Sequence, residues 1–421
     1  MTAGALMTAA PAGAQNPWTA ERVLNIAHQG GEDEAPSNTM YAYQRAMRLG
    51  TDMLELDVHS TADGRLVVLH DAKVDRTTDG TGYVYDMTLP EVQTLDAAYT
   101  FVPGVGTTDD YGPASYPFRG VRTGDRRPPP GYHRRDFRIP TLDEVLRTYP
   151  EVPINIEIKG RADGDSASFD RNADLLAALL NRTGRSEGII VASFNDPALD
   201  RFHAQAPQIG MAPAAGDVAA FKFASTPLPE GMVAFQVPIT FSGIQVTDAD
   251  FVQRAHEHDY AVHVWLSNDG EDVSIYNQLL DWNVDGIMAA QPGRLERTLC
   301  GRGVVRPEHG PKWPGGPHCT PHNSIACDVR PIAANRSGKR LRVTLLRRDE
   351  FAGRCAGRVR VSARGKSVTP RFAFGDVPPS AGGPDEVVIR LPFAPVDRVR
   401  ISALPYEAFP HTRLYQLTNT P

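Results

Sequence analysis

Short runs of apolar and β-branched residues recur through residues 23–288 of this 421-residue chain, and helical patterns separate several of them. Strands that alternate with helices form a parallel sheet, and about eight such units close it into a barrel. The pattern therefore predicts an α/β fold, a (β/α)8 TIM-type barrel, with one of nine candidate strands auxiliary or spurious. The candidates are Val23–Ala27, Met53–Val58, Leu66–Leu69, Ile154–Ile158, Ile189–Ser193, Ile209–Ala212, Val233–Val237, Ala261–Trp265 and Gly286–Met288.

The predicted barrel covers residues 21–300, but residues 72–138 interrupt its alternation. This stretch is rich in Gly, Pro, Tyr and Arg and is too long for an ordinary connector. Since loops at a barrel mouth build active sites, we interpret it as a cap that shapes the substrate site. A Pro/Gly-rich linker is expected over 301–330. Short strand patterns then predict a small antiparallel β domain over 331–421.

Charge divides the chain in the same place. The net charge is −6, yet residues 301–421 hold 20 Lys and Arg against 9 Asp and Glu. Two modules with different surfaces are therefore expected. The basic domain is either an arginine-rich stabilising module or a dock for an anionic membrane or cell-wall surface. No motif indicates a nucleic-acid partner, and no apolar run is long enough to span a bilayer.

The cysteines indicate an oxidising compartment. All four, Cys300, Cys319, Cys327 and Cys355, lie in the basic part, and none forms the C-x-x-C spacing of a zinc site. We favour the disulfides Cys300–Cys319 and Cys327–Cys355 over the other two pairings. Residues 1–20 are small and apolar at first, with Ala12-Gly13-Ala14 resembling a signal-peptidase site. They are either a signal-peptide remnant or a disordered tail, and we expect a secreted or extracytoplasmic protein.

Acidic residues stand at the ends of predicted strands. Glu55 and Asp57 are two positions apart, so both side chains leave the same face of their strand. Glu157 ends another strand and can supply a third carboxylate. Such a set suits one hard divalent cation, Ca²⁺ or Mg²⁺. The alternative is a set of ion pairs, for which Lys159 is a candidate partner.

Two histidines, His28 and His70, also stand at strand ends. Hydrolysis of a phosphodiester needs a base for the nucleophile and an acid for the leaving alkoxide. Imidazole can do either near neutral pH. The two side chains therefore predict an acid–base pair beside a metal-bound phosphate, rather than two structural histidines.

These ordered motifs resemble the glycerophosphodiester phosphodiesterase family, one of the phosphatidylinositol-phospholipase-C-like barrels, over roughly residues 22–299. The likeness rests on His28-x-Gly30, Pro36-x-Asn38-Thr39, Glu55-x-Asp57-Val58, His70-Asp71, Ile139-Pro140-Thr141-Leu142, Glu157-Ile158-Lys159, Ser193-Phe194, Val264-Trp265-x-x-Asn268 and Val284-Asp285-Gly286-Ile287. It implies hydrolysis of glycerophosphodiesters to glycerol 3-phosphate and an alcohol. The implied roles are acid–base catalysis by His28 and His70, metal binding by Glu55, Asp57 and Glu157, phosphate contact by Lys159, and an apolar wall from Trp265.

Three departures from the family motif concern the substrate. Gln29 replaces an arginine that would grip phosphate, Ser37 replaces a glutamate, and Ala290-Gln291 replaces Thr-Asp. A neutral amide lacks the charged, bidentate contact of a guanidinium, although it can still bind substrate. An arginine of the cap could replace the lost one. The candidates are Arg119, Arg122, Arg126, Arg127, Arg134 and Arg135.

Two other functions remain open from the sequence. The same metal and histidines could cleave lysophospholipid or sphingolipid head groups by internal attack, which would give a cyclic phosphate. A barrel that had lost its arginine could instead bind phosphodiesters or envelope polymers without turnover. Product analysis and a metal-dependent turnover assay separate the three.

Overall fold

The computed structural model describes most of the predicted barrel and part of the C-terminal region. The described residues are 16–19, 23–129, 131–266, 271–304, 329–337, 340–347, 355–363, 366–374, 385–390, 398–405 and 411–416. The predicted signal-peptide remnant up to residue 15, most of the linker, and Cys319 and Cys327 lie outside them. The disulfide pairing therefore stays a prediction.

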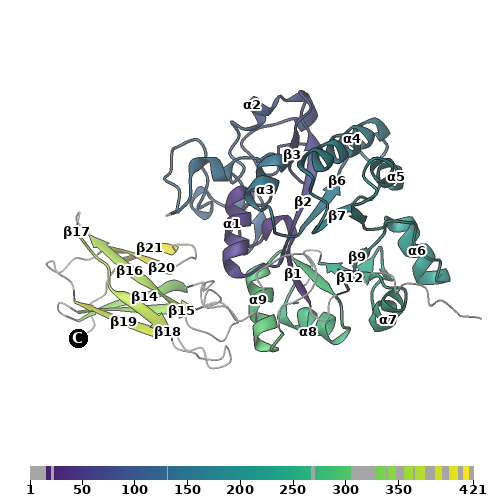
Figure 1. Cartoon of the computed structure of the whole chain (residues 1–421). Coiled ribbons are helices and arrows are strands. Elements are labelled where there is room, and N and C mark those ends of the chain that lie inside the picture. The colour runs from purple at the N-terminus through teal and green to yellow at the C-terminus, as the bar shows by residue number, and fades with distance from the viewer. Residues whose placement is uncertain are drawn as a thin grey trace, which may run out of the picture.

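Eight parallel strands form the ring of the barrel, and helices surround it (Figure 1). The hydrogen-bonded order is β8-β7-β6-β2-β1-β13-β12-β9. A bridge between Met211 and Met232 brings β8 beside the chain that enters β9, so the ring nearly closes. The predicted (β/α)8 class is confirmed. The strands are β1 (Leu24–Ala27), β2 (Met53–Ser60), β6 (Ile154–Ile158), β7 (Ile189–Ala192), β8 (Gly210–Met211), β9 (Ala234–Pro238), β12 (Ala261–Trp265) and β13 (Gly286–Ala289).

The ninth candidate strand is auxiliary. β3 (Leu66–Val68) pairs antiparallel with the end of β2, where His59 faces Val67. The chain therefore turns back toward the mouth instead of crossing to a new strand. Leu69 N donates to Asp57 O at 3.0 Å, which brings the following residue, His70, to the level of the acidic residues of β2.

The helices begin where polar side chains satisfy their first N–H groups. Thr39, Thr141 and Asp248 accept such bonds at α1, α3 and α7. The sequence patterns did not predict α5, α6 and α9. In α6 only Phe221 is fully buried, so its sequence lacks a clear apolar face. The helices around the ring are α1 (Met40–Leu49), α3 (Leu142–Thr148), α4 (Ser166–Thr183), α5 (Asp196–Gln205), α6 (Ala215–Ala224), α7 (Ala249–Glu257), α8 (Val273–Asp281) and α9 (Pro292–Gly301).

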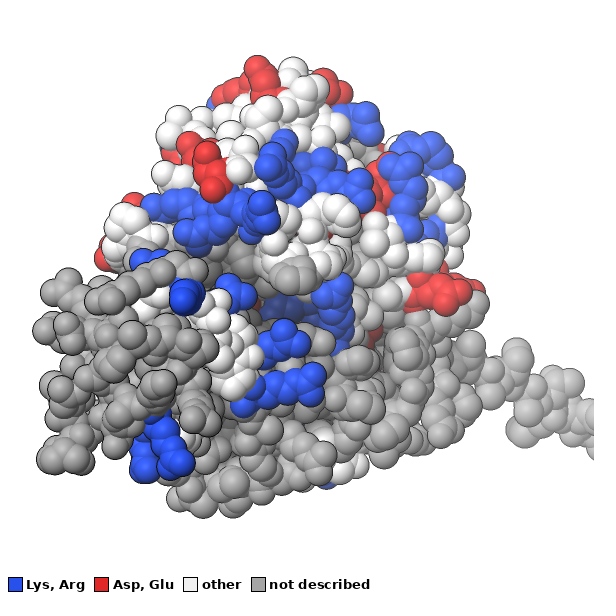
Figure 2. All heavy atoms as spheres, turned by 90° about the vertical axis from the view of Figure 1, so that its left-hand side faces the viewer, with Lys and Arg blue, Asp and Glu red and all other residues white. Residues whose placement is uncertain are grey.

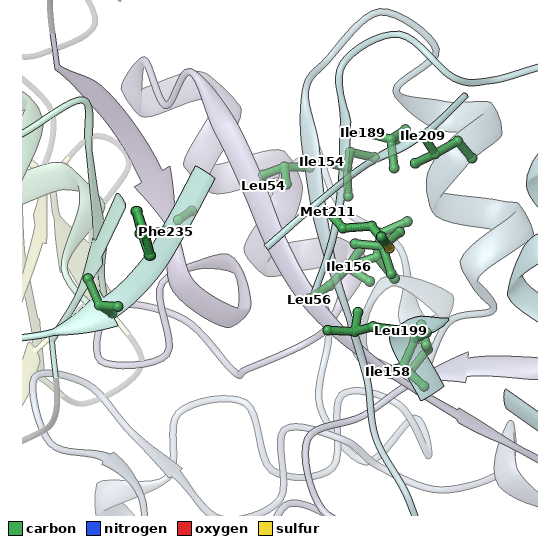
Figure 3. Close-up of a cluster of buried hydrophobic side chains, with 14 of the residues drawn as sticks. Leu54, Leu56, Ile154, Ile156, Ile158, Ile189, Leu199, Ile209, Met211 and Phe235 are labelled. Atoms are coloured by element: carbon green, nitrogen blue, oxygen red, sulfur yellow. The ribbon is translucent and has the colours of Figure 1, made fainter. Parts of the chain in front are cut away.

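Alternate residues of each strand enter two different layers of the core. On β2, Leu54 and Leu56 belong to the layer between strands and helices, whereas Met53 belongs to a cluster inside the ring. Figure 3 shows part of the outer layer, where apolar side chains of β2, β6 and β7 gather with Leu199 of α5. Glu55 and Asp57 stand two and four positions after Met53 and therefore lie on the same face of β2, so both face the interior of the barrel.

The cap over 72–138 is more ordered than its loop-like sequence suggests. It contains η2 (Val84–Asp86), α2 (Leu89–Val92), β4 (Phe101–Val102), β5 (Gly106–Thr107), η3 (Pro113–Ser115) and η4 (Arg134–Phe137). Two small hydrophobic clusters pack it against the barrel, one including Tyr41 and Phe118 and the other including Val67 and Val92. The side chain of Asp96 accepts the N–H of Gly120 at 2.7 Å. Apolar packing and buried polar contacts therefore hold the cap together.

The described C-terminal residues form two antiparallel sheets, in agreement with the predicted β domain. β14 (Val329–Ser337), β15 (Arg340–Arg347) and β19 (Asp385–Arg390) make one sheet. β16 (Cys355–Ala363), β17 (Lys366–Val368), β18 (Arg371–Phe374), β20 (Arg398–Pro405) and β21 (His411–Gln416) make the other. Among the described residues, no helix combines the length and apolar character needed to span a membrane.

Two phenylalanines of α6 test the core directly. Phe221 is fully buried and its ring lies 4.7 Å from that of Phe235, whereas Phe223 is 70% exposed. We expect Phe221→Ala to lower the free energy of unfolding by about 3–5 kcal/mol. Phe223→Ala should change it by less than about 0.5 kcal/mol. Urea denaturation of both variants measures this, and equal effects would contradict the described packing.

Candidate active site

Three carboxylates converge at the mouth of the barrel. Glu55 and Asp57 come from β2, and Glu157 comes from the facing position of the neighbouring β6. One oxygen of each lies within 4.8 Å of the others, and both β2 side chains are nearly fully buried. The alternation of side chains along β2 and its register with β6 therefore bring together the three acids that the sequence singled out.

Lys159 sits against this cluster. Its Nζ lies 2.7 Å from Glu157 Oε1 and 3.2 Å from Asp57 Oδ1. Burial disfavours the charged form of Asp57, but the lysine and the two nearby histidines outweigh burial and lower the pKa of that carboxyl. Burial, together with Asp57, raises the pKa of Glu55. One lysine thus partly neutralises three acids, so both of the sequence interpretations, ion pair and cation site, describe part of the arrangement.

His28 follows β1 and faces the acids with one ring nitrogen. Its Nδ1 lies 2.5 Å from Glu32 Oε1, and its Nε2 lies 3.9 Å from Glu55 Oε2. Burial opposes protonation of His28, but the two glutamates outweigh burial and raise its pKa. Glu32 was not identified from the sequence, although a carboxylate four residues after a histidine was a usable signal.

His70 also has its ring held by a carboxylate. Its Nδ1 lies 2.7 Å from Asp71 Oδ1, and Arg76 Nε binds Asp71 Oδ2 at 2.6 Å. Burial opposes ionisation of Asp71, but its bonds to His70 and Arg76 outweigh burial and lower its pKa. Each candidate catalytic histidine therefore has Nδ1 fixed by its own carboxylate, which leaves Nε2 for proton transfer.

Backbone and amide groups complete the cluster. Gln29 N donates to Glu55 Oε2 at 2.7 Å, and Asn38 Nδ2 donates to Asp57 Oδ2 at 3.1 Å. Tyr43 Oη in turn donates to Asn38 Oδ1 at 2.7 Å. Gln29 adopts the left-handed conformation (φ 48°) that points its N–H at Glu55. The motif residues after His28 thus position the acids, a role that the sequence did not reveal.

The remaining predicted residues have mixed placements. The half-buried Trp265 ends β12 and packs on the apolar cluster inside the ring. Arg119 and Arg122 donate to the carbonyls of Tyr99 and Gln93 within the cap. Arg126 donates to the carbonyls of Tyr116 and Pro117. These three arginines stabilise the cap, and the structure gives none of them a contact with the acidic cluster.

The donor set fits a divalent cation. Three mutually close carboxylates at a barrel mouth provide oxygen ligands, and one lysine does not balance their charge. Together with the two anchored histidines, the cluster gives this barrel the groups that an enzyme would need for acid–base chemistry on an anionic substrate.

Comparison with known proteins agrees with this class. The model of the glycerophosphoryl diester phosphodiesterase family matches residues 28–294. The chain is 30% identical over 279 residues to a glycerophosphodiester phosphodiesterase of Caldanaerobacter subterraneus subsp. tengcongensis, covering 65% of this chain and 96% of the relative. It is 27% identical over 288 residues to one of Bacillus subtilis, covering 67% and 88%.

A solved structure agrees at the level of the fold. A protein from Silicibacter pomeroyi DSS-3, classed with the glycerophosphoryl diester phosphodiesterases, superimposes with a TM-score of 0.52 at 20% identity, covering 69% of this chain and 98% of that one. The chain belongs to the glycerophosphoryl diester phosphodiesterase family and is a phosphoric diester hydrolase.

Replacing Lys159 tests the electrostatics of the cluster. We expect Lys159→Met to lower the free energy of unfolding by about 3–5 kcal/mol without divalent cations, because it leaves buried acids unpaired. Saturating Ca²⁺ or Mg²⁺ should restore much of that loss, since a ligand that binds only the folded state stabilises it. Urea denaturation with and without the cation measures both effects.

Lys222→Met is the matched control, because Lys222 Nζ makes a partly exposed 2.7 Å ion pair with Asp248 far from β2 and β6 in the sequence. It should lose no more than about 1 kcal/mol and respond to the cation like the wild type. An equal loss in both variants that no cation reverses would contradict the cation site.

Proposed function

We propose that the chain is a secreted, metal-dependent phosphodiesterase that hydrolyses glycerophosphodiesters to glycerol 3-phosphate and an alcohol, with His28 and His70 as the acid–base pair. The observation that carries the proposal is the cluster of three carboxylate oxygens within 4.8 Å, together with two histidines whose Nδ1 atoms are each held by a carboxylate. Product formation and its dependence on both histidines test it.

The proposed mechanism divides the work among the site residues. Glu55, Asp57 and Glu157 would hold the cation, which when bound polarises a phosphoryl oxygen and neutralises developing charge. Lys159 orients the phosphate, since its ammonium already lies among the acids. One histidine accepts a proton from the attacking water, and the other donates a proton to the leaving alkoxide through Nε2. Glu32 and Asp71 keep the two rings in position.

Support for secretion comes from the cysteines and from the apolar N-terminal residues. No cysteine among the described residues is free, and Cys300, in the last turn of α9, is disulfide-bonded. Disulfides persist in oxidising compartments. We therefore propose that the protein acts outside the cytoplasm.

Turnover of glycerophosphocholine tests the reaction. We expect phosphorus NMR to show glycerol 3-phosphate as the product, formed only with a divalent cation. His28→Ala and His70→Ala should each reduce kcat by roughly a hundredfold or more, because each removes a proton-transfer group. A cyclic phosphate would favour internal attack on a lysophospholipid-type substrate, and an absence of turnover would favour a binding protein.

Gln29→Arg tests how the phosphate is held. A guanidinium adds a charge-assisted contact of about 1.5–3 kcal/mol, or roughly tenfold to a hundredfold in kcat/KM on simple diesters. The exposed Gln253→Arg on α7 is the control and should leave kcat/KM unchanged. Equal or lower activity of the Gln29 variant would mean that this chain holds phosphate in another way.

We also propose that the basic C-terminal domain contacts an anionic membrane or cell-wall surface. The strands of the five-stranded sheet carry six arginines and one lysine but no acidic residue. Arg358 lies directly opposite Arg371, and such like-charge pairs destabilise a sheet unless something anionic neutralises them. Figure 2 views the molecule from the side of this domain and shows both blue Lys and Arg side chains and red acidic ones on the described surface.

One face of that sheet presents the charge. Arg358, Arg360, Arg371 and Arg400 are exposed, whereas Val359 and its neighbours on the opposite face are buried. Each arginine near an anionic surface contributes about 1 kcal/mol. Replacing all four with Gln should therefore lower the affinity for phosphatidylglycerol-containing vesicles, or for cell-wall material, by roughly a thousandfold at low salt. Co-sedimentation measures this affinity.

A control variant carries the same change of charge on the barrel. R147Q, R182Q, R201Q and R302Q replace four exposed arginines on or beside its helices. This variant should sediment almost as the wild type does. An equal loss in both variants would show attraction by net charge alone, without a docking face.

A further inference from the structure

A chain of buried hydrogen bonds joins two of the site residues through the cap. His59 occupies the next inward position of β2 after Asp57 and is 1% exposed. Its Nε2 lies 3.1 Å from the backbone oxygen of His70, and its Nδ1 lies 2.8 Å from Tyr85 Oη. Tyr85 belongs to η2 of the cap, so the cap reaches the strand that carries the acids.

The chain continues to the other side of the site. Asn172 of α4 is fully buried, and its Nδ2 donates both to Tyr85 Oη at 2.9 Å and to the backbone oxygen of Lys159 at 2.7 Å. Four hydrogen bonds thus connect the carbonyl of Lys159 with the carbonyl of His70. β2 lies between the strands that precede these two residues, because it pairs with β6 on one side and β3 on the other.

The directions of these bonds are fixed by chemistry. A carbonyl only accepts, so His59 Nε2 carries the hydrogen and its Nδ1 accepts. Tyr85 must then donate to His59 while it accepts from Asn172. The tyrosine hydroxyl therefore accepts a hydrogen bond from Asn172 and donates one to His59. A phenylalanine in its place would remove both of these hydrogen bonds.

We propose that Tyr85 is a positioning residue that, through His59 and Asn172, fixes the separation of His70 from Lys159. The role rests on the proposed functions of those two residues. The long insertion would then contribute to catalysis even without touching the substrate, because Tyr85 is one of its residues. A displacement of about 1 Å in a catalytic group can reduce the rate by about a hundredfold.

Tyr85→Phe removes one hydroxyl and tests the role. We expect kcat on glycerophosphocholine to fall by roughly tenfold to a hundredfold with KM nearly unchanged, as for an interaction needed in the transition state. His59→Gln should retain most of the activity, because its amide can donate to His70 and accept from Tyr85. His59→Leu can do neither and should resemble Tyr85→Phe.

Tyr116→Phe is the matched control. Tyr116 is also a buried cap tyrosine, but its hydroxyl accepts from Tyr111 N at 3.1 Å. This variant should lose a similar amount of thermal stability and keep its kcat. Equal kcat for the two Phe variants, or a His59→Gln variant as impaired as His59→Leu, would overturn the positioning role. Wild-type turnover is the separate test of the proposed function, and an inactive wild type would remove both.

Discussion

Mutual repulsion among three carboxylates in one small volume is the constraint on which the rest of the site depends. Isolated buried charge is strongly unfavourable, so Glu55, Asp57 and Glu157 persist only because other groups stabilise them. The lysine after β6 contacts two of them, and the Gln29 N–H and the Asn38 amide contact one each. Apolar residues at these positions would serve stability better, which supports the proposal that the cluster binds a cation.

The auxiliary strand and the cap follow from the same site. β2 extends past the ring, and β3 folds back on this extension so that His70 returns to the level of Asp57. Asp71, just before the cap, binds the His70 ring, and Arg76 of the cap binds Asp71. The insertion therefore contacts the surroundings of the second histidine twice: Arg76 binds Asp71, and Tyr85 binds His59, which in turn binds the His70 backbone. Arg119, Arg122 and Arg126 instead donate to carbonyl groups of the cap itself.

The sequence could predict the features that depend on local periodicity. Strand alternation placed Glu55 and Asp57 on one face, and the position of Glu157 at a neighbouring strand end brought it to the same mouth. Contacts between distant segments could not be predicted, because no local pattern encodes them. Asn172 meets Tyr85 across 87 residues, for example. α6 was missed because its burial rests on one phenylalanine. The cap was predicted, but its internal order was not, because irregular side-chain–backbone bonds stabilise it.

The central claim is that the carboxylate cluster holds one divalent cation. Isothermal titration of Ca²⁺ and of Mg²⁺ into the full-length chain tests this most directly, with the Glu55→Gln, Asp57→Asn, Glu157→Gln triple variant as the comparison. The account predicts one cation per chain in the wild type and none in the variant. Failure of the wild type to bind either cation, or equal binding by the variant, would contradict it.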